Sequence, residues 1–274
     1  MRIHCEKKFS ILLILLSIGS GLISIYAQTS VKLPATTIIG TNTSVDYSTN
    51  SPSTTVNTKS NAFDGNLNTY FASYERSGTW LGLDLGEKHI LTKIAYAPRY
   101  HDFPEGPKRL VLGIFEGANN PDFGDAVPLL MITEAPPPNV MTEQSIHCSK
   151  GFRYVRYVGP NDMRCNIAEI EFYGYQSAGD NSHFPQLTNL PVISIHTVNN
   201  QDITSKEQYV KGIVSIIHDG AIFSDSLDIR GRGNASWTFP KKPYRMKLYN
   251  KVNLLGFPAR EKSWTLINNW GDKT

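Results

Sequence analysis

This sequence has few cysteines and a small net charge. Only three of the 274 residues are cysteine, and one of them, Cys5, lies close to the amino terminus. The other two, Cys148 and Cys165, permit a single disulfide in an exported protein, and two free buried thiols are the alternative. The formal net charge of +3 is too small to identify a partner. We expect no nucleic-acid partner.

Long helical periodicity is also missing from the first two thirds of the chain. Short apolar runs alternate there with turn residues, which is typical of an all-β sandwich. No long segment with a 3.6-residue period interrupts them. The expected strands are residues 80–85, 90–97, 109–116, 129–133, 152–158 and 167–173.

The amino terminus has the pattern of a secretory signal peptide. Arg2, Lys7 and Lys8 precede an apolar run over residues 9–25, and Ala27 closes a small-residue cleavage site. A retained membrane anchor is the alternative, although the run is near the lower limit for crossing a bilayer. We therefore expect residues 1–27 to be removed, leaving no membrane span, and the protein to be secreted, periplasmic or at the cell surface.

The remaining length allows about two domains. Residues 41–60 are rich in Ser, Thr and Asn, and taken alone they would be a flexible linker. Residues 176–188 are rich in Ser, Gly, Asp, Asn and Pro, and we place the interdomain linker there. A second apolar alternation follows over residues 189–274, with expected strands at 190–197, 210–217, 226–230, 244–248 and 264–267.

Four motifs in the first domain occur in a recognisable order. They are Asn-Ala-Phe-Asp-Gly-Asn-Leu-Asn-Thr at 61–69, Trp-Leu-Gly-Leu-Asp-Leu-Gly at 80–86, Arg-Tyr-Val-Arg-Tyr at 153–157 and Ala-Glu-Ile-Glu-Phe-Tyr-Gly at 168–174. Together they resemble the discoidin, or coagulation-factor type C, domain, a galactose-binding-like β-sandwich used by many carbohydrate-binding modules. The resemblance implies a jelly-roll sandwich over residues 34–175 with ligand-binding loops at one end.

The acidic turn at residues 64–69 offers several oxygen atoms, which are the ligands that Ca²⁺ prefers. The resemblance implies a structural calcium ion held by Asp64, Thr69, the carbonyl of Ala168 and Glu169, with Asn66 as a further candidate. The alternative is an Asx-type turn without metal, in which Asp64 bonds its own backbone. A bound calcium ion would steady the sandwich and would do no chemistry.

Sugar recognition needs an aromatic surface and polar side chains that bond hydroxyl groups. Tyr74 and the loop containing Arg99, Tyr100 and His101 provide both. The resemblance points to Arg99, because family members often use an arginine after this strand. We expect a glycan or glycoprotein as the partner. The alternative is that these are ordinary surface residues of a loop, or that the loop binds a protein.

The carboxyl-terminal third is locally basic. Between Arg230 and Lys262 it has nine basic residues, and Glu261 is the only acid. Glycines alternate with arginines at its start, which suits a phosphate group. The candidate phosphate- or nucleotide-binding residues are Arg230, Gly231, Arg232, Gly233, Asn234, Lys242, Arg245 and Lys247. The alternative is a basic hairpin with a solvated charged face.

The same region carries a second resemblance. Arg-Gly-Arg-Gly-Asn at 230–234, Phe-Pro-Lys-Lys-Pro-Tyr-Arg at 239–245 and Asn-Asn-Trp-Gly-Asp-Lys-Thr at 268–274 resemble the spore coat protein H (CotH) family of atypical kinases. The resemblance implies the amino-terminal lobe of a kinase domain. The complete domain would bind ATP and Mg²⁺ and phosphorylate a protein substrate. The family's catalytic acids belong to a later lobe, so we expect an amino-terminal fragment without catalytic residues, inactive alone.

These patterns predict a mainly β protein: a discoidin-like jelly-roll β-sandwich followed by a β-rich, incomplete kinase-like amino-terminal lobe. The functional prediction is an exported carbohydrate-binding module fused to a CotH-like kinase domain. The alternative is a non-enzymatic glycan-binding or adhesion protein of the cell surface.

Overall fold

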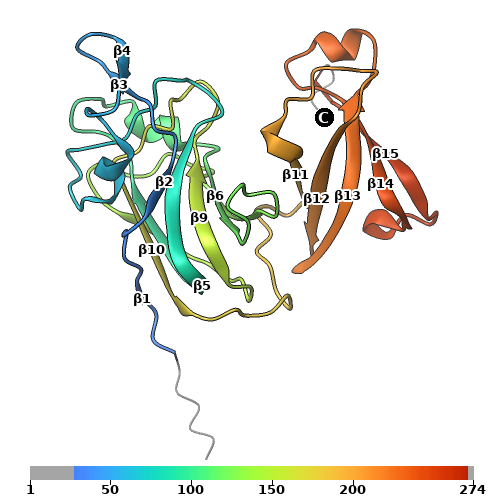
Figure 1. Cartoon of the computed structure of the whole chain (residues 1–274), viewed down its shortest axis with the longest axis horizontal. Helices are drawn as coiled ribbons and strands as arrows, with labels where there is room; N and C mark the ends of the chain where they lie inside the picture. The colour runs from blue at the N-terminus through green and yellow to red at the C-terminus, as the bar shows by residue number, and fades with distance from the viewer. Residues whose placement is uncertain (1–27, 271–274) are drawn as a thin grey trace, which may run out of the picture.

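The computed structural model describes residues 28–270, and the predicted signal peptide at residues 1–27 lies outside them. The described chain is built from β-strands with short 3₁₀ turns between them, which confirms the predicted mainly β class. Figure 1 shows two β units, with the second placed beside the first. Among residues 28–270, no helix has the length and apolar character needed to cross a membrane.

The first unit is a β-sandwich. Its eight-stranded assembly has the order β1-β10-β5-β9-β6-β7, with β2 and β8 also paired to β5. The strands are β1 (Val31–Lys32), β2 (Ile38–Gly40), β5 (Trp80–Ala97), β6 (Ile114–Ala118), β7 (Val127–Met131), β8 (Thr142–Ser145), β9 (Phe152–Val158) and β10 (Glu169–Gln176). Every pairing is antiparallel.

Strand β5 belongs to both layers of the sandwich. Its first half lies between β2 and β9, and its second half lies between β10 and β8. The β5–β9 register shifts between Asp84 and His89, and Gly86 takes a φ of +76° there. A glycine adopts this backbone conformation without steric cost. The sequence predicted two strands separated at Gly86; one bulged strand of 18 residues forms instead, because each half has a partner ladder.

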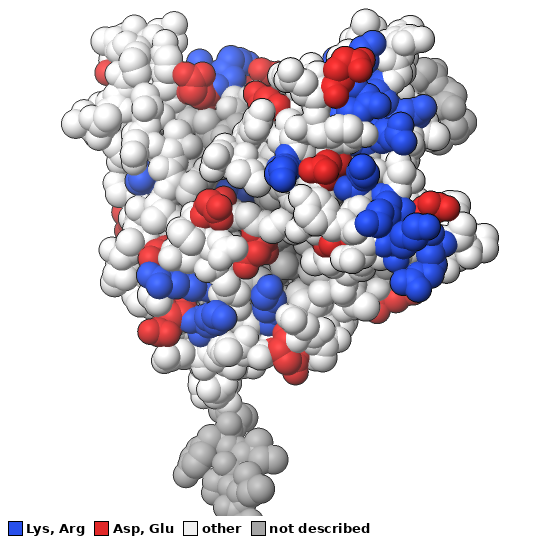
Figure 2. Space-filling model, turned by 45° about the vertical axis from the view of Figure 1, so that its right-hand side comes forward, with Lys and Arg blue, Asp and Glu red and all other residues white. Residues whose placement is uncertain are grey.

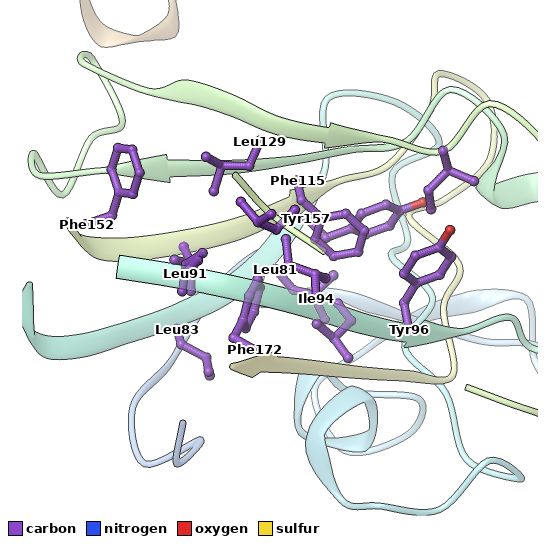
Figure 3. Close-up of a cluster of buried hydrophobic side chains, with 14 of the residues drawn as sticks. Leu81, Leu83, Leu91, Ile94, Tyr96, Phe115, Leu129, Phe152, Tyr157 and Phe172 are labelled. Atoms are coloured by element: carbon purple, nitrogen blue, oxygen red, sulfur yellow. The ribbon is translucent and has the colours of Figure 1, made fainter. Parts of the chain in front are cut away.

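The core lies between the two layers (Figure 3). Leu81 and Leu83 come from the first half of β5, and Leu91 and Ile94 from the second half; all four are almost completely buried. Aromatic rings join the layers: the centroids of Phe115 and Phe172 lie 6.1 Å apart in an edge-to-face arrangement. Short apolar runs of this kind, separated by turn residues, are the signal that made the sandwich predictable from the sequence.

Three local predictions in the sandwich differ from the structure. Composition taken alone indicated a flexible linker at residues 41–60, although the predicted sandwich over residues 34–175 includes them; they form the hairpin of β3 (Ser44–Asp46) and β4 (Ser51–Ser53), with Val45 fully buried. The expected strand at 109–116 begins later, at Ile114, since residues Gly106–Leu110 form a 3₁₀ turn. Strand β8 was not predicted, because its residues are mostly polar and exposed.

The second unit is a five-stranded antiparallel sheet in chain order. Its strands are β11 (Val192–Thr197), β12 (Val210–His218), β13 (Ala221–Gly231), β14 (Tyr244–Val252) and β15 (Glu261–Leu266). Asp219 and Gly220 join β12 to β13 with φ values of +50° and +76°, as a two-residue hairpin turn requires. One face is apolar, and its buried members include Val214, Ile216, Leu227, Ile229, Met246 and Leu248.

The segment predicted as a linker is packed against both units. The side chain of Phe184 is fully buried, and its backbone N–H donates to the carbonyl of Gly220 at 2.9 Å. On the other side, the N–H of Ser149 in the sandwich donates to the carbonyl of His183 at 3.0 Å. Ile217 of β12 joins the same buried cluster as the sandwich core. The polar composition of residues 176–188 therefore gave no indication that Phe184 is buried between the two units.

The two described cysteines are free thiols. Cys148 and Cys165 are both buried and unpaired with each other. Burial raises the pKa of both thiols, so both are kept protonated. Of the two alternatives open from the sequence, the structure has the two buried thiols.

Candidate functional site

The turn after the 3₁₀ segment Lys59–Phe63 is organised by Asp64. Its carboxylate accepts the N–H of Asn66 at 2.8 Å and the hydroxyl of Thr69 at 2.8 Å. Gly65 has a φ of +78°, which lets the chain reverse directly after the acid. The turn thus has the Asx geometry expected of Asp64 and places three oxygen-bearing side chains, those of Asp64, Asn66 and Thr69, within six residues.

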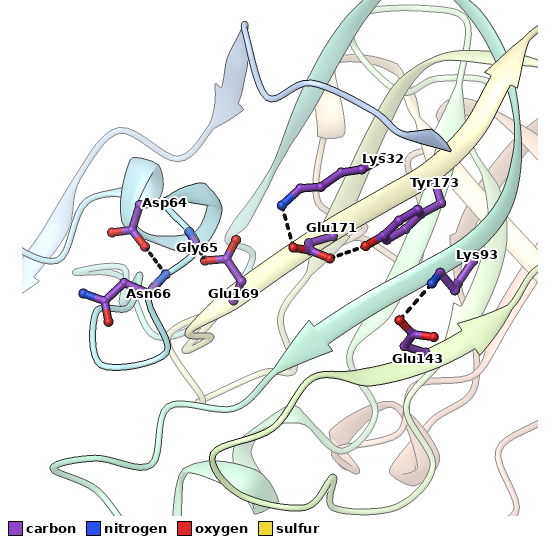
Figure 4. Close-up of polar contacts among 9 residues, drawn as sticks. All are labelled: Lys32, Asp64, Gly65, Asn66, Lys93, Glu143, Glu169, Glu171 and Tyr173. Atoms are coloured by element: carbon purple, nitrogen blue, oxygen red, sulfur yellow. Dashed lines mark hydrogen bonds and ion pairs between the residues drawn. The ribbon is translucent and has the colours of Figure 1, made fainter. Parts of the chain in front are cut away.

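Glu169 brings a second carboxylate to this turn from the start of β10. One oxygen, Oε2, accepts the backbone N–H of Gly65 at 3.1 Å (Figure 4). The other, Oε1, is buried and has no hydrogen-bond partner among the described residues. Glu169 is only 2% exposed. Burial and, less strongly, the nearby charge of Asp64 raise the pKa of Glu169 to about 7, against the opposing effect of the hydrogen bond from the Gly65 N–H.

These residues fit a hard cation that binds oxygen. Unpartnered buried carboxylate oxygens are costly, and a cation removes both the lost hydrogen bond and the repulsion between two acids. Ala168 is buried directly before Glu169, where the sequence resemblance places a carbonyl ligand. No group of three or more His, Cys, Asp or Glu side chains gathers as a metal site within residues 28–270. Any cation here would accordingly draw on hydroxyl, amide and carbonyl oxygens as well as the two carboxylates.

Arg99 follows β5 and is the centre of a second polar cluster. Its Nε and Nη2 donate to the two carboxylate oxygens of Asp102 at 2.6 and 2.5 Å. The guanidinium carbon lies 3.7 Å from the ring centroid of Tyr70 and 4.7 Å from that of Tyr47. The Arg99 side chain is only 8% exposed. A bidentate pair and two ring faces therefore fix the guanidinium in one orientation.

The remaining polar atoms of this cluster connect three loops. The Tyr70 hydroxyl donates to Asp102 at 3.3 Å, and burial raises the pKa of Tyr70 to about 12. The Nδ2 of Asn166 donates to the hydroxyl of Tyr47 at 3.5 Å. Asn166 is 1% exposed, and its Oδ1 has no partner among the described residues. We define Tyr47, Tyr70, Arg99, Asp102 and Asn166 as the arginine cluster.

The other predicted glycan-binding residues surround this cluster. The carbonyl of Tyr100 accepts the N–H of Phe103 at 3.0 Å, and the resulting turn presents Asp102 to Arg99. His101 is exposed on that turn. Tyr74 lies on another loop, where its carbonyl accepts a hydrogen bond from Arg164. Arg99 is thus placed at the centre, and no hydrogen bond or ring contact between described residues ties Tyr74 or His101 to its guanidinium.

The glycine-containing turn at residues 230–234 is already hydrogen-bonded. The N–H of Gly231 donates to the Ser205 carbonyl at 2.8 Å, and the N–H of Arg232 donates to the Pro243 carbonyl at 3.2 Å. Gly233 has a φ of +85°. Two of the backbone donors expected to face a phosphate therefore donate to carbonyls of neighbouring segments, whereas the N–H of Asn234 donates to no described residue.

The cations of this region point in different directions. The Nζ of Lys242 donates to the carbonyl of Trp237 at 2.7 Å. Arg230 donates to the carbonyl of Lys206 and lies 5.2 Å from the Tyr209 ring centroid. Arg245 and Lys247 are exposed on β14, on the side opposite the buried Met246 and Leu248. Lys242 is therefore bonded to the turn segment, whereas Arg230, Arg245 and Lys247 lie on β13 and β14 of the sheet.

Tyr47, Asn166 and Arg164 were missed by the sequence interpretation. Tyr47 lies in the Ser/Thr/Asn-rich stretch, and Asn166 and Arg164 precede β10 in an irregular loop where Asp162, Arg164 and Cys165 have positive φ. The only local signal was the isolated tyrosine among small polar residues. Their roles depend on contacts between loops that are remote in the chain: Asn166 and Tyr47 are 119 residues apart, and Arg164 and Tyr74 are 90 residues apart.

Comparisons with known proteins identify the family of the first unit. The family model described as "F5/8 type C domain" matches residues 44–172. The chain is 40% identical to the CBM62 module of Xyl5A from Clostridium thermocellum, over 54% of this chain and 99% of that one, with a TM-score of 0.47. It is 19% identical to the CBM32 module of AlyQ in complex with 4,5-unsaturated mannuronic acid, over 52% and 97% of the two chains, with a TM-score of 0.39.

The C-terminal domain of a chitobiase from Bacteroides fragilis is 17% identical over 54% of this chain and 99% of its own, with a TM-score of 0.41. A search among curated proteins finds no match. The first unit is a carbohydrate-binding module-like domain. Through residues 44–172, the chain therefore belongs to the F5/8 type C domain family.

Proposed function

We propose that the sandwich binds a glycan at the arginine cluster. The observation that carries this proposal is the guanidinium of Arg99, held by Asp102 and stacked on Tyr70 and Tyr47. Its third nitrogen, Nη1, has no hydrogen bond to a described residue. A preoriented guanidinium next to an exposed tyrosine offers a donor for sugar hydroxyls and an apolar surface for a ring.

The rigidity of the cluster supports this function. Ordering a long side chain on binding costs free energy, and Arg99 is already ordered by its two bonds to Asp102. The unpartnered Oδ1 of Asn166 adds an acceptor beside Tyr47. The partner in this proposal is a glycan or glycoprotein, and Tyr74, Tyr100 and His101 would line the outer loops.

We further propose that Ca²⁺ is the cation at the acidic turn. Asp64, Asn66, Thr69, Ala168 and Glu169 would hold it, and it would supply structural charge neutralisation without chemistry. The support is the unpartnered Oε1 of Glu169 together with the proximity of Asp64. The ion would join the acidic turn at residues 64–69 to β10, and thereby stabilise the loops that carry the proposed glycan site.

For the second unit we propose the amino-terminal part of a CotH-like kinase domain. The support is the ordered set of motifs in residues 230–274, with ATP, Mg²⁺ and a protein substrate expected for a complete domain. The acids in residues 189–274 form no recognisable catalytic motif in the sequence, so we expect the 274-residue chain to transfer no phosphate. Phosphotransfer above that of a heat-inactivated control would overturn this expectation.

The rival is a cell-surface adhesion protein in which both units only bind. The kinase-fusion proposal and the adhesion proposal both place the protein outside the cytosol, which the predicted signal peptide and the family of the sandwich favour. A glycan array with the full chain tests the central proposal, with binding to galactose-type or related sugars expected. The absence of binding to any glycan would favour a protein ligand for the sandwich.

A further inference from the structure

The second sheet has a solvent-facing side whose character differs from its apolar side. Along β14, Arg245, Lys247 and Tyr249 are exposed, whereas Met246 and Leu248 between them are buried. Alternation along a strand puts the exposed set on one face. Figure 2 shows Lys and Arg side chains gathered over this unit. The sheet therefore presents a basic face to the solvent.

Cross-strand pairing extends this face over four strands. Lys247 is paired with Asp228 on β13 and with Ser263 on β15, and Asp228 is paired with Lys211 on β12. In the next row, Arg245 is paired with Arg230 and Thr265. Paired strands are about 4.8 Å apart, so these side chains form a compact array.

Three cations of this array, Lys211, Arg245 and Lys247, are exposed and available to a ligand, whereas Arg230 donates to the carbonyl of Lys206. Asp228 is the only acid in the two rows, and among the described residues neither it nor any other carboxylate is within ion-pair distance of Lys211, Arg245 or Lys247. The one side-chain bond of Arg245 is donated by Nε to the Ser263 hydroxyl at 3.1 Å. Its positive charge is consequently not neutralised.

Two exposed tyrosines border the cations. Tyr209 is 41% exposed and Tyr249 is 47% exposed. The Arg230 guanidinium lies 5.2 Å from the ring centroid of Tyr209, which places that ring at one edge of the array. Tyr249 follows Lys247 by two residues and so lies on the same side of β14. We call Tyr209, Lys211, Arg230, Arg245, Lys247 and Tyr249 the basic face.

We propose that the basic face binds a linear anionic polysaccharide of the polyuronate type. Repeated carboxylates match an array of cations, and the tyrosine rings match the apolar faces of sugar rings. An array spread over several strands suits an extended polymer better than one compact phosphate group. The preference for a polysaccharide over a nucleic acid rests on the proposed glycan-binding function of the sandwich, because basic and aromatic surfaces also bind single strands.

The test measures binding of the full chain to polygalacturonate in the presence of a chelator, with neutral galactan and poly(dT) as comparisons. The double variant R245Q/K247Q should weaken polygalacturonate binding roughly fivefold, as expected for two exposed charge contacts. The control K88Q/K108Q removes the same charge from the sandwich and should change binding little. Y249S should weaken binding without altering its salt dependence, because no charge is removed.

Equal losses in the two double variants would mean that only net charge matters, and would overturn the inference. Tighter binding of poly(dT) than of polygalacturonate would replace it with a nucleic-acid surface. A chain that binds polygalacturonate but no neutral glycan keeps this inference and overturns the proposed sandwich function; the reverse result overturns this inference alone. Circular dichroism and melting curves establish that each variant is folded.

Discussion

The carboxylate of Glu169 accepts a hydrogen bond of 3.1 Å from the backbone N–H of Gly65, although 104 residues separate them. This contact joins the acidic turn at residues 64–69 to the start of β10. It also leaves the second oxygen of Glu169 buried without a partner among the described residues. The acidic turn is therefore assembled only when both ends of the domain are in place.

We expect calcium to raise the melting temperature of the full chain by roughly 5 °C or more at saturation, because a ligand that binds only the folded state stabilises it by mass action. The variant D64N should remove this increment, since it removes one of the two carboxylates. Differential scanning calorimetry with calcium and with chelator measures both effects.

Asp46 provides a matched control for this experiment. Its carboxylate also closes an Asx turn, by accepting the N–H of Ser48 at 2.9 Å, but no second acid is bonded into that turn. D46N should therefore keep the calcium increment. A melting temperature that is indifferent to calcium, or an increment lost equally in both variants, would count against the site.

Replacement of Arg99 by lysine should weaken glycan binding about tenfold or more, since a lysine cannot form the bidentate pair and charged hydrogen bonds contribute about 1.5–3 kcal/mol. The control is R109K, because the Arg109 guanidinium also lies over Phe103, at 4.7 Å, but is not bonded to Asp102. Calorimetric titration with the best ligand from the array measures both. Similar affinities in the two variants would place the glycan elsewhere.

Glycan affinity should fall in acid as Asp102 is protonated. The hydrogen bond from Arg99 lowers the pKa of Asp102 below its ordinary value of 3.8. A lowered carboxyl pKa means that the ionised pair holds Arg99 above pH 3.8 and releases it as the pH falls through the lower folded-state value. Affinity should be constant from neutral pH to about pH 5 and decline below pH 4. In D102N this acid decline should disappear; an identical pH profile would exclude Asp102 as the titrating group.

The variant F184A should lower the free energy of unfolding by about 3–5 kcal/mol, as for other buried phenylalanines. Phe184 is fully buried where the linking segment meets both units. L190A, at a position 66% exposed, should change stability by less than about 0.5 kcal/mol. Urea denaturation of the full chain compares them. Similar small effects would show that the segment is not anchored through Phe184.

Much of the sandwich was predictable because its signals are local. Strand β9 has the bounds expected from the sequence, since five of its seven residues are aromatic or β-branched and a glycine stands on each side of it. The acidic turn was predictable for the same reason: Asp64 bonds to atoms within five residues of itself. The family motifs added the order of the elements, which periodicity alone does not provide.

Only the tertiary structure decided how these elements combine. The continuation of β5 through Gly86 depends on partners in two layers, and the arginine cluster depends on Tyr47 and Asn166, which lie 119 residues apart. The burial of Phe184 depends on a second sheet whose position no local pattern encodes. Sequence periodicity reports which side of a strand is buried, because that is a property of neighbouring residues. Which loops meet is set by long-range packing, because the contacts that stabilise it join residues remote in the chain.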